Sequence, residues 1–239
     1  MEIAVFIICT GKYNIFFDKF YESSEKYFLP EYKKTYYVFT DGNIIKRGNI
    51  KRIQQEKIGW PYDTMYRFKM FNSIKNIVIK KDYAFFFNVN MEFVDYIGNE
   101  ILPGADNSYL VGVNHPGFYN KNIDAFPYER NEDSVFYIPF GSGSNYYQGC
   151  LNGGRTTEYM EMSEKLDHMI GEDLGNGIIP EWWDESALNW YYDRLETKPL
   201  MLPPSYAYPE SQELGIEEKK IIQIDKEKKG GHNFLRFNT

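Results

Sequence analysis

The stretch that decides the fold is DYAFFFNVNMEF, residues 82–93. Its apolar run from Tyr83 to Phe87 has the length and composition of a buried strand, and it stops at Asn88-Val89-Asn90. Two acidic residues one apart at the end of such a strand are a common way to hold a divalent cation, and here both positions carry amides. The stretch therefore predicts a polar site at a strand end, without the negative charge that a metal needs.

The segments around this stretch alternate between strands and helices. We expect buried strands at residues 2–9, 34–41, 52–58 and 83–90, and amphipathic helices at residues 16–29 and 63–78. This alternation predicts an α/β fold with a parallel, Rossmann-like sheet. Ligands of such sheets bind beyond the carboxyl ends of the strands, where Asn88 and Asn90 fall.

The second half of the chain has a more broken pattern. Short strands and turns are expected at residues 109–119, 134–140 and 146–154, followed by a helix at residues 156–175. Another helix is expected to start near Asp184, a residue type that caps helices well. No internal repeat or low-complexity linker separates the two halves, so we expect them to share one interface.

Charge and cysteine content narrow the class of protein. The net charge of −7 over 239 residues argues against a nucleic-acid partner. Residues 219–239 nevertheless carry a local +4, which leaves −11 on the remainder and makes this tail either an anion-binding element or a solvated end. Cys9 and Cys150 form neither a disulfide framework nor a zinc spacing, and no segment resembles a signal peptide or a membrane span. We therefore expect a soluble, cytoplasmic protein without a membrane anchor.

The segment EWWDESALNWYY, residues 181–192, is the most suggestive acidic site. With Asp184 as the cap, Glu185 lies in the first turn, near the positive end of the helix dipole, and shares a face with Asn189. Tryptophans beside two acids suit a sugar, because the rings stack on it and the carboxylates meet hydroxyls and positive charge at an anomeric carbon. The alternative is an ordinary capped helix with a tryptophan-rich core face.

Two further motifs have weaker signals when taken singly. Gly153-Gly154 either lets the backbone approach a ligand or forms a plain turn. His115 precedes Pro-Gly, and a lone histidine is more often structural than a ligand. The chain has no phosphate-binding P-loop motif and no metal-spaced histidine cluster.

Taken in order, the motifs resemble glycosyltransferase family 6, which contains the blood-group A and B transferases and the α1,3-galactosyltransferases. The resemblance runs from about Val5 to Pro204 and rests on TYYVFTD, NVNMEF, HPGFY, YERN, YYQGCLNGG and WWDESALNWYY. It implies one catalytic domain of the GT-A type, with a Rossmann-like nucleotide-binding half fused to an acceptor-binding half. We expect a UDP-binding half at about 1–90, a donor-sugar and acceptor half at about 91–218, and a basic C-terminal lid at about 219–239. Without the anchor and stem of the animal members, the chain resembles a soluble bacterial member.

The resemblance also implies an activity. Such enzymes move galactose or N-acetylgalactosamine from a UDP-sugar to the 3-hydroxyl of a galactoside and retain the α configuration. Gly149 and Cys150 fall in the loop that discriminates donors, and their small size favours UDP-GalNAc over UDP-Gal. A fucosylated, H-antigen-like β-galactoside is the expected acceptor. The alternatives are a UDP-Gal-dependent α1,3-galactosyltransferase and an inactive sugar-binding homologue.

The family's site residues carry over onto matching positions. Donor-binding roles fall on Ile8, Thr10, Tyr13, Arg67, Gln148, Gly149, Cys150 and Asp184. Acceptor-binding roles fall on His115, Trp182 and Glu185, while Pro127 replaces a hydroxyl residue of the animal members. Glu185 is also the expected catalytic residue, the acid nearest the anomeric carbon, as a covalent nucleophile or as a stabiliser of an oxocarbenium-like transition state.

The chain departs from the family at its metal motif. Animal members carry Asp-Val-Asp, which binds manganese, where this chain has Asn88-Val89-Asn90. We therefore expect no divalent metal and no other cofactor, with Asn88 and Asn90 hydrogen-bonding the donor directly. The cation that stabilises the departing diphosphate is expected from the C-terminal lid, through Lys229 and Arg236, with Lys228 as a further candidate and Gly230-Gly231 as the hinge.

Overall fold

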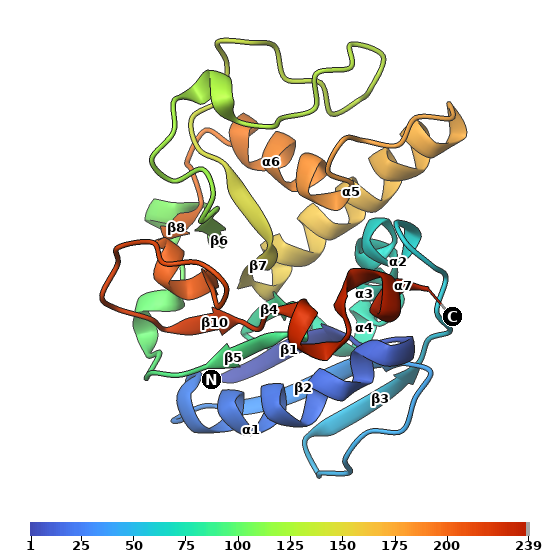
Figure 1. Cartoon of the computed structure of the whole chain (residues 1–239), viewed down its shortest axis with the longest axis vertical. Coiled ribbons are helices and arrows are strands. Elements are labelled where there is room, and N and C mark those ends of the chain that lie inside the picture. The colour runs from blue at the N-terminus through green and yellow to red at the C-terminus, as the bar shows by residue number, and fades with distance from the viewer. Residues whose placement is uncertain (238–239) are drawn as a thin grey trace.

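The computed structural model describes residues 1–237 and confirms the α/β class (Figure 1). Its main sheet has seven strands in the order β3-β2-β1-β4-β7-β6-β8. These strands are β1 (Glu2–Ile8), β2 (Lys33–Thr40), β3 (Ile50–Gln54), β4 (Tyr83–Phe87), β6 (Leu110–Asn114), β7 (Tyr147–Arg155) and β8 (Leu200–Leu202). The first four are parallel as expected, but β7 runs antiparallel to both β4 and β6, so the sheet is mixed.

Helices cover both faces of this sheet because side chains alternate along its strands. In β1, Ile3, Val5 and Ile7 pack into the cluster that includes Phe17 and Phe20 of α1. Ala4 and Phe6 point to the opposite face, where residues of α3, α5 and α6 pack. The α-helices are α1 (Phe17–Tyr27), α2 (Tyr62–Met65), α3 (Arg67–Asn72), α4 (Lys75–Val78), α5 (Thr156–Gly175), α6 (Asp184–Arg194) and α7 (Gly231–Arg236). Short 3-10 helices are η1 (Gly11–Phe16), η2 (Asn99–Ile101), η3 (Ala105–Asn107), η4 (Ile123–Ala125), η5 (Pro204–Ala207) and η6 (Lys226–Lys229).

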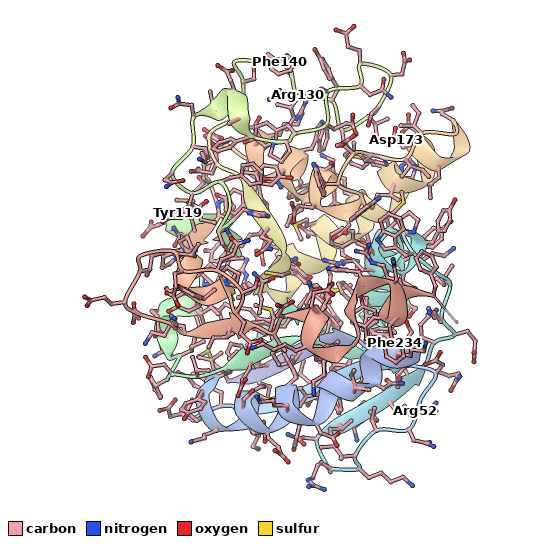
Figure 2. All side chains as sticks on the ribbon, in the orientation of Figure 1. Arg52, Tyr119, Arg130, Phe140, Asp173 and Phe234 are labelled. Carbon is pink, nitrogen blue, oxygen red and sulfur yellow. The ribbon has the colours of Figure 1, made fainter. Side chains whose placement is uncertain are left out.

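Several expected elements differ in the structure. The single helix expected at residues 63–78 is broken into α2, α3 and α4. Residues 134–140 form no strand; this loop is held instead by Asp173 of α5, which accepts hydrogen bonds from the Ser134 hydroxyl at 2.6 Å and the Val135 amide at 2.9 Å (Figure 2). Gly153-Gly154 forms no turn, because both residues lie inside β7, where an added Cβ would meet Ala84 of β4 or Tyr109 beside β6.

A second, three-stranded sheet places the C-terminal segment beside the NVN motif. It has the order β5-β10-β9, from β5 (Met91–Phe93), β10 (Ile221–Gln223) and β9 (Tyr208–Pro209). Just beyond β10, the Ile224 amide donates to the Asn90 carbonyl at 2.8 Å, and the Asn90 side-chain amide donates to the Ile224 carbonyl at 3.1 Å. In Figure 1 this segment runs beside β5 and continues to α7.

Within residues 1–237, no helix combines the length and the apolar character that crossing a bilayer requires.

Candidate active site

A cavity of about 220 Å³ lies beyond the carboxyl ends of β1 and β4, against the start of β7 and the start of α6. The main sheet supplies one wall, and the C-terminal segment supplies another through Lys226 and Arg236. The cavity brings together thirteen residues that the sequence analysis singled out: Ile8, Thr10, Tyr13, Arg67, Asn88, Asn90, Gln148, Gly149, Cys150, Trp182, Asp184, Glu185 and Arg236. His115 and Lys229, which were also predicted, are not in its lining.

Asp184 forms a buried ion pair instead of the expected helix cap. Its carboxylate lies 2.7 Å from the Arg67 guanidinium, and both side chains are less than a tenth exposed. Asp184 is the first residue of α6, and no side chain caps that helix. Burial raises the pKa of Asp184 to about 6, against the lowering effect of Arg67. Arg67 opens α3, so the break in the expected long helix is what aims its guanidinium at the cavity.

Glu185 is held by the backbone of Gly149. Its Oε2 accepts a hydrogen bond from the Gly149 amide at 2.7 Å, while the Gly149 carbonyl accepts one from Arg67 at 2.6 Å. Burial raises the pKa of Glu185 to about 7, and the Gly149 amide lowers it, though by less. The backbone of one residue, Gly149, therefore fixes Glu185 and Arg67, and through Arg67 also Asp184, relative to one another.

The reason for a glycine at position 149 is the proximity of these carboxylates. A Cβ there would lie 3.2 Å from Asp184 Oδ2 and 3.5 Å from Glu185 Oε2. The space that the missing side chain leaves is therefore already taken by the two carboxylates. Gly149 opens no extra room for a substituent on the donor sugar. The basis on which the sequence favoured UDP-GalNAc is correspondingly weaker at this residue.

Asn189 fastens α6 to the start of β7. Its Oδ1 accepts from the Tyr147 amide at 2.8 Å, and its Nδ2 donates to the Tyr147 carbonyl at 2.8 Å and to the Glu185 carbonyl at 2.9 Å. The side chain is 1% exposed. This clamp sets the distance between Glu185 on the helix and Gly149 on the strand.

The predicted donor-selective loop is tied to the C-terminal half. Gln148 Oε1 accepts hydrogen bonds from Gln223 Nε2 at 2.9 Å and from the Cys150 thiol at 3.1 Å. Gln223 belongs to β10 and also donates to the Ala207 carbonyl at 2.6 Å. The orientation of Gln148 therefore depends on β10, the strand that leads to Lys226.

Tryptophans form the rim of the cavity. Trp182 is 40% exposed. Trp183 has a φ of 57°, a strained value for a large side chain, and its ring packs edge-on against Trp60 with centroids 4.7 Å apart. The turn thus leaves Trp183 half-buried and Trp182 facing solvent, as stacking on an exposed sugar requires.

His115 lies outside the cavity lining, behind Tyr146. Its ring packs against Phe118 and Tyr146, and its Nδ1 accepts a hydrogen bond from the Gly117 amide at 2.9 Å. Burial lowers the pKa of His115 to about 4, so the imidazole is neutral at neutral pH. The Tyr146 hydroxyl in turn lowers the pKa of Glu185.

The lysine of the C-terminal segment that faces the cavity is Lys226, whereas the predicted Lys229 is not in the lining. Lys229 is exposed, and Lys228 forms an ion pair with Glu210 at 2.7 Å. Lys226 follows Asp225, which caps η6, and its Nζ lies 5.5 Å from the centre of the Tyr13 ring. Burial, followed by the charge of Arg236, lowers the pKa of Lys226 to about 8. The capping aspartate after the apolar run IIQI was the signal that could have singled out this lysine.

The residues around the NVN motif do not fit a carboxylate-held divalent cation. Asn90 uses its side-chain amide to hold Ile224. The three acids of the lining have other partners: Asp184 pairs with Arg67, Glu185 accepts from the Gly149 amide, and Asp63 accepts from two backbone amides. Across residues 1–237, no three of the His, Cys, Asp and Glu side chains gather closely enough to hold a metal ion. Lys226 and Arg236 of the C-terminal segment supply positive charge to the same cavity.

Sequence reasoning missed several residues of the lining. They are Lys57, Trp60, Asp63, Thr64, Phe86, Val89, Trp183 and Lys226. Most lie in loops or short helices whose course the apolar pattern does not reveal.

Comparison with known proteins agrees with this geometry. The family model for glycosyltransferase family 6 matches residues 1–236. The chain is 38% identical to the O-antigen biosynthesis glycosyltransferase WbnI of Escherichia coli, over 99% of this chain and 100% of that protein. It is 34% identical to the histo-blood group ABO system transferase 2 of Rattus norvegicus and 32% identical to the globoside alpha-1,3-N-acetylgalactosaminyltransferase 1 of Gallus gallus, over 86% and 87% of this chain. It spans 63% and 62% of the lengths of these two animal proteins. The chain therefore belongs to glycosyltransferase family 6, as a hexosyltransferase with a GT-A-like α/β fold that takes a nucleotide-sugar donor and a glycan acceptor.

Proposed function

We propose that this enzyme moves N-acetylgalactosamine from UDP-GalNAc to the 3-hydroxyl of a fucosylated, H-antigen-like β-galactoside, retains the α configuration and uses no divalent metal. The observation that carries the proposal is one cavity with two acids on one wall, Asp184 and Glu185, and two cations on another, Lys226 and Arg236. Hexosyl transfer from a nucleotide sugar develops positive charge at the anomeric carbon and negative charge on the diphosphate. The two walls match these two charges.

Glu185 is the group assigned to the anomeric carbon. Its carboxylate either attacks this carbon or stabilises an oxocarbenium-like transition state. A pKa of about 7 keeps a large fraction of Glu185 ionised at neutral pH, and the Gly149 hydrogen bond fixes its orientation before the donor arrives. Asp184, held by Arg67, is assigned to hydroxyls of the donor sugar.

Lys226 and Arg236 are assigned to the leaving diphosphate. Fixed cations that meet charge developing in the transition state contribute strongly to catalysis, above all where water is excluded. Asn88 and Asn90 add no negative charge that would repel the diphosphate, and both line the cavity. This arrangement supplies the positive charge that a metal ion would otherwise bring.

The choice of donor and of acceptor is supported by names of relatives and by the exposed Trp182. Two of the matched proteins are named for N-acetylgalactosaminyl transfer and for the ABO blood-group system. UDP-Gal remains the alternative donor, because Gly149 gives no added room for the acetamido group.

The test measures transfer to 2′-fucosyllactose from UDP-GalNAc and, in parallel, from UDP-Gal, with excess EDTA and then with manganese. We expect full activity in EDTA and a higher kcat/KM for UDP-GalNAc. Lys226→Met is expected to lower kcat in EDTA by roughly 10²- to 10³-fold, as loss of one group that stabilises transition-state charge does. The matched variant Lys229→Met, which removes an exposed lysine three residues away, is expected to change kcat less than about twofold.

Four outcomes would contradict parts of this proposal. Activity only with manganese would overturn metal independence. A higher kcat/KM for UDP-Gal would replace the donor, and equal losses in the Lys226→Met and Lys229→Met variants would remove the special role of Lys226. Transfer from neither donor would exclude this substrate pair.

A further inference from the structure

Lys57 is a buried cation that the proposed chemistry does not use. It follows β3, where the chain has left the sheet, and it lines the cavity. Asp63 holds the next two residues in place, since its carboxylate accepts from the Ile58 amide at 2.8 Å and the Gly59 amide at 3.0 Å. The Lys57 ammonium is buried, and it has no hydrogen-bond partner among residues 1–237.

Burying such an ammonium lowers the stability of the fold unless a bound molecule accepts a hydrogen bond from it. Burying an unpaired charge is among the most unfavourable arrangements in a folded protein. Asp63 accepts from the Ile58 and Gly59 amides and Asp41 accepts from the Gly11 amide at 2.8 Å, and within residues 1–237 neither carboxylate accepts a hydrogen bond from Lys57. A hydrogen-bond acceptor on a bound molecule is therefore the missing partner.

The backbone around Gly11 is shaped to admit this side chain. Gly11 has a φ of 56°, and a Cβ there would lie 2.9 Å from Lys57 Cδ. Both the left-handed backbone and the absence of a side chain are thus needed at this position. The lysine is built into the turn that follows β1, beside Thr10 and Tyr13.

The other charged groups locate Lys57 along the cavity. Besides burial, the charges of Glu185 and Lys226 affect the pKa of the Cys150 thiol, so Lys226 lies near the part of the cavity that holds Glu185. After burial, the charge of Arg236 is the largest influence on the pKa values of Lys226 and Tyr13, so Arg236 lies near both Lys226 and the turn after β1. Lys57 lies against Gly11 in that turn, and the neighbouring Thr10 and Tyr13, which carry donor-binding roles in the family resemblance, line the cavity beside it.

We propose that Lys57 donates a hydrogen bond to an acceptor oxygen of the donor's nucleoside, a carbonyl of the uracil ring or a hydroxyl of the ribose. This inference rests on the proposed function, because it takes the donor to be a UDP-sugar. It makes Lys57 a binding residue that is not engaged with the reacting atoms. The free energy it contributes is the same in the ground state and in the transition state, so its loss raises KM and leaves kcat unchanged.

The experiment measures affinities for UDP, UMP and inorganic pyrophosphate by titration calorimetry, with wild type and Lys57→Met. The matched control is Lys51→Met, which removes an exposed lysine of β3 and changes the net charge equally. We expect Lys57→Met to lower the affinities for UDP and UMP by the same factor, roughly 10-fold or more for loss of a hydrogen bond from a charged group. The affinity for pyrophosphate should change by less than about twofold. KM for the donor should rise by that factor at constant kcat. The Tm without ligand should be unchanged or higher, since the variant removes a buried unpaired charge.

Each other outcome has one meaning. Unchanged UDP affinity in Lys57→Met would overturn the inference, and an equal loss for UDP and pyrophosphate would move Lys57 to the diphosphate and overturn its assignment to the nucleoside. A lower Tm together with a reduced kcat would assign Lys57 a structural role instead. Wild-type protein that binds no UDP but binds another nucleoside diphosphate would reject the proposed donor itself, which separates that failure from a failure of Lys57.

Discussion

Glu185 sets the expected dependence of the reaction on pH. Since burial raises its pKa to about 7 and the proposed role needs the carboxylate, kcat/KM should rise as pH increases through about 7. Glu185→Gln keeps an oxygen that can accept from Gly149, and it should lower kcat by roughly 10²- to 10³-fold and remove this limb of the pH profile. Initial rates between pH 5 and 9 test both expectations, and a profile of the same shape in the variant would assign the titration to another group.

The same pKa determines how Glu185 affects stability. Its folded-state pKa of about 7 exceeds the ordinary value of 4.5, so the folded protein binds more protons in this window and loses stability as pH rises through it. Glu185→Gln should therefore have a higher Tm than wild type at pH 8 and a similar Tm at pH 4. This opposite effect on stability and on activity would distinguish a functional acid from a structural one.

A site residue could be predicted from the sequence where its chemistry and motif mark it. It could not be predicted where only the path of the backbone brings it to the cavity. Asp184, Glu185 and Arg67 carry chemistry that the motifs reveal, and they meet in the cavity. Lys226 and Lys229 have the same chemistry and lie three residues apart, and only the turn of η6 decides which one faces inward. Lys57 gave no signal, since its burial depends on the path of a loop after β3.

At the scale of elements, Asn189 joins α6 to β7, and its removal tests whether this junction positions the site. Asn189→Ala leaves the Tyr147 amide and carbonyl without side-chain partners in a buried place. Unsatisfied buried polar groups cost about 1–3 kcal/mol each, so we expect a loss of about 2–4 kcal/mol in the free energy of unfolding. Urea denaturation measures this loss, with Asn120→Ala at an exposed asparagine as the control. We also expect kcat to fall, because Glu185 no longer faces Gly149 in a fixed register. A loss below about 0.5 kcal/mol would contradict the role of Asn189 as the link between α6 and β7.

Elements with strong, uninterrupted periodicity were predictable from the sequence. The division of the expected helix at residues 63–78 into shorter helices beside the site was not. The expected helix at residues 156–175 has the bounds of α5, and β1, β2 and β4 lie where alternation or apolar runs placed them. The apolar spacing of residues 63–78 continues across the breaks between α2, α3 and α4, so it could not reveal them. The break before Arg67 lies at the site, since Arg67 is the ion-pair partner of Asp184.

At the scale of the whole molecule, the main sheet passes through both of the halves that the sequence suggested. β4 pairs with β7 over five residue pairs, from Tyr83 with Arg155 to Phe87 with Leu151. One core cluster contains Val5 of β1 together with Val111 of β6 and Leu202 of β8. Local patterns predict the strands but carry no information on this antiparallel pairing, which depends on contacts between residues far apart in the chain.

A continuous sheet and core predict that the two halves unfold together. Calorimetry should show one transition whose calorimetric and van't Hoff enthalpies agree. Saturating UDP at 100 times its Kd adds about 2.7 kcal/mol, which corresponds to a rise in Tm of roughly 5–10 °C for a domain of this size. Because the cavity is built from β1, β4, β7, α6 and the C-terminal segment, the ligand should shift the whole transition without splitting it. Two transitions, of which only one responds to UDP, would mean that the halves are independent units and that the cavity belongs to one of them.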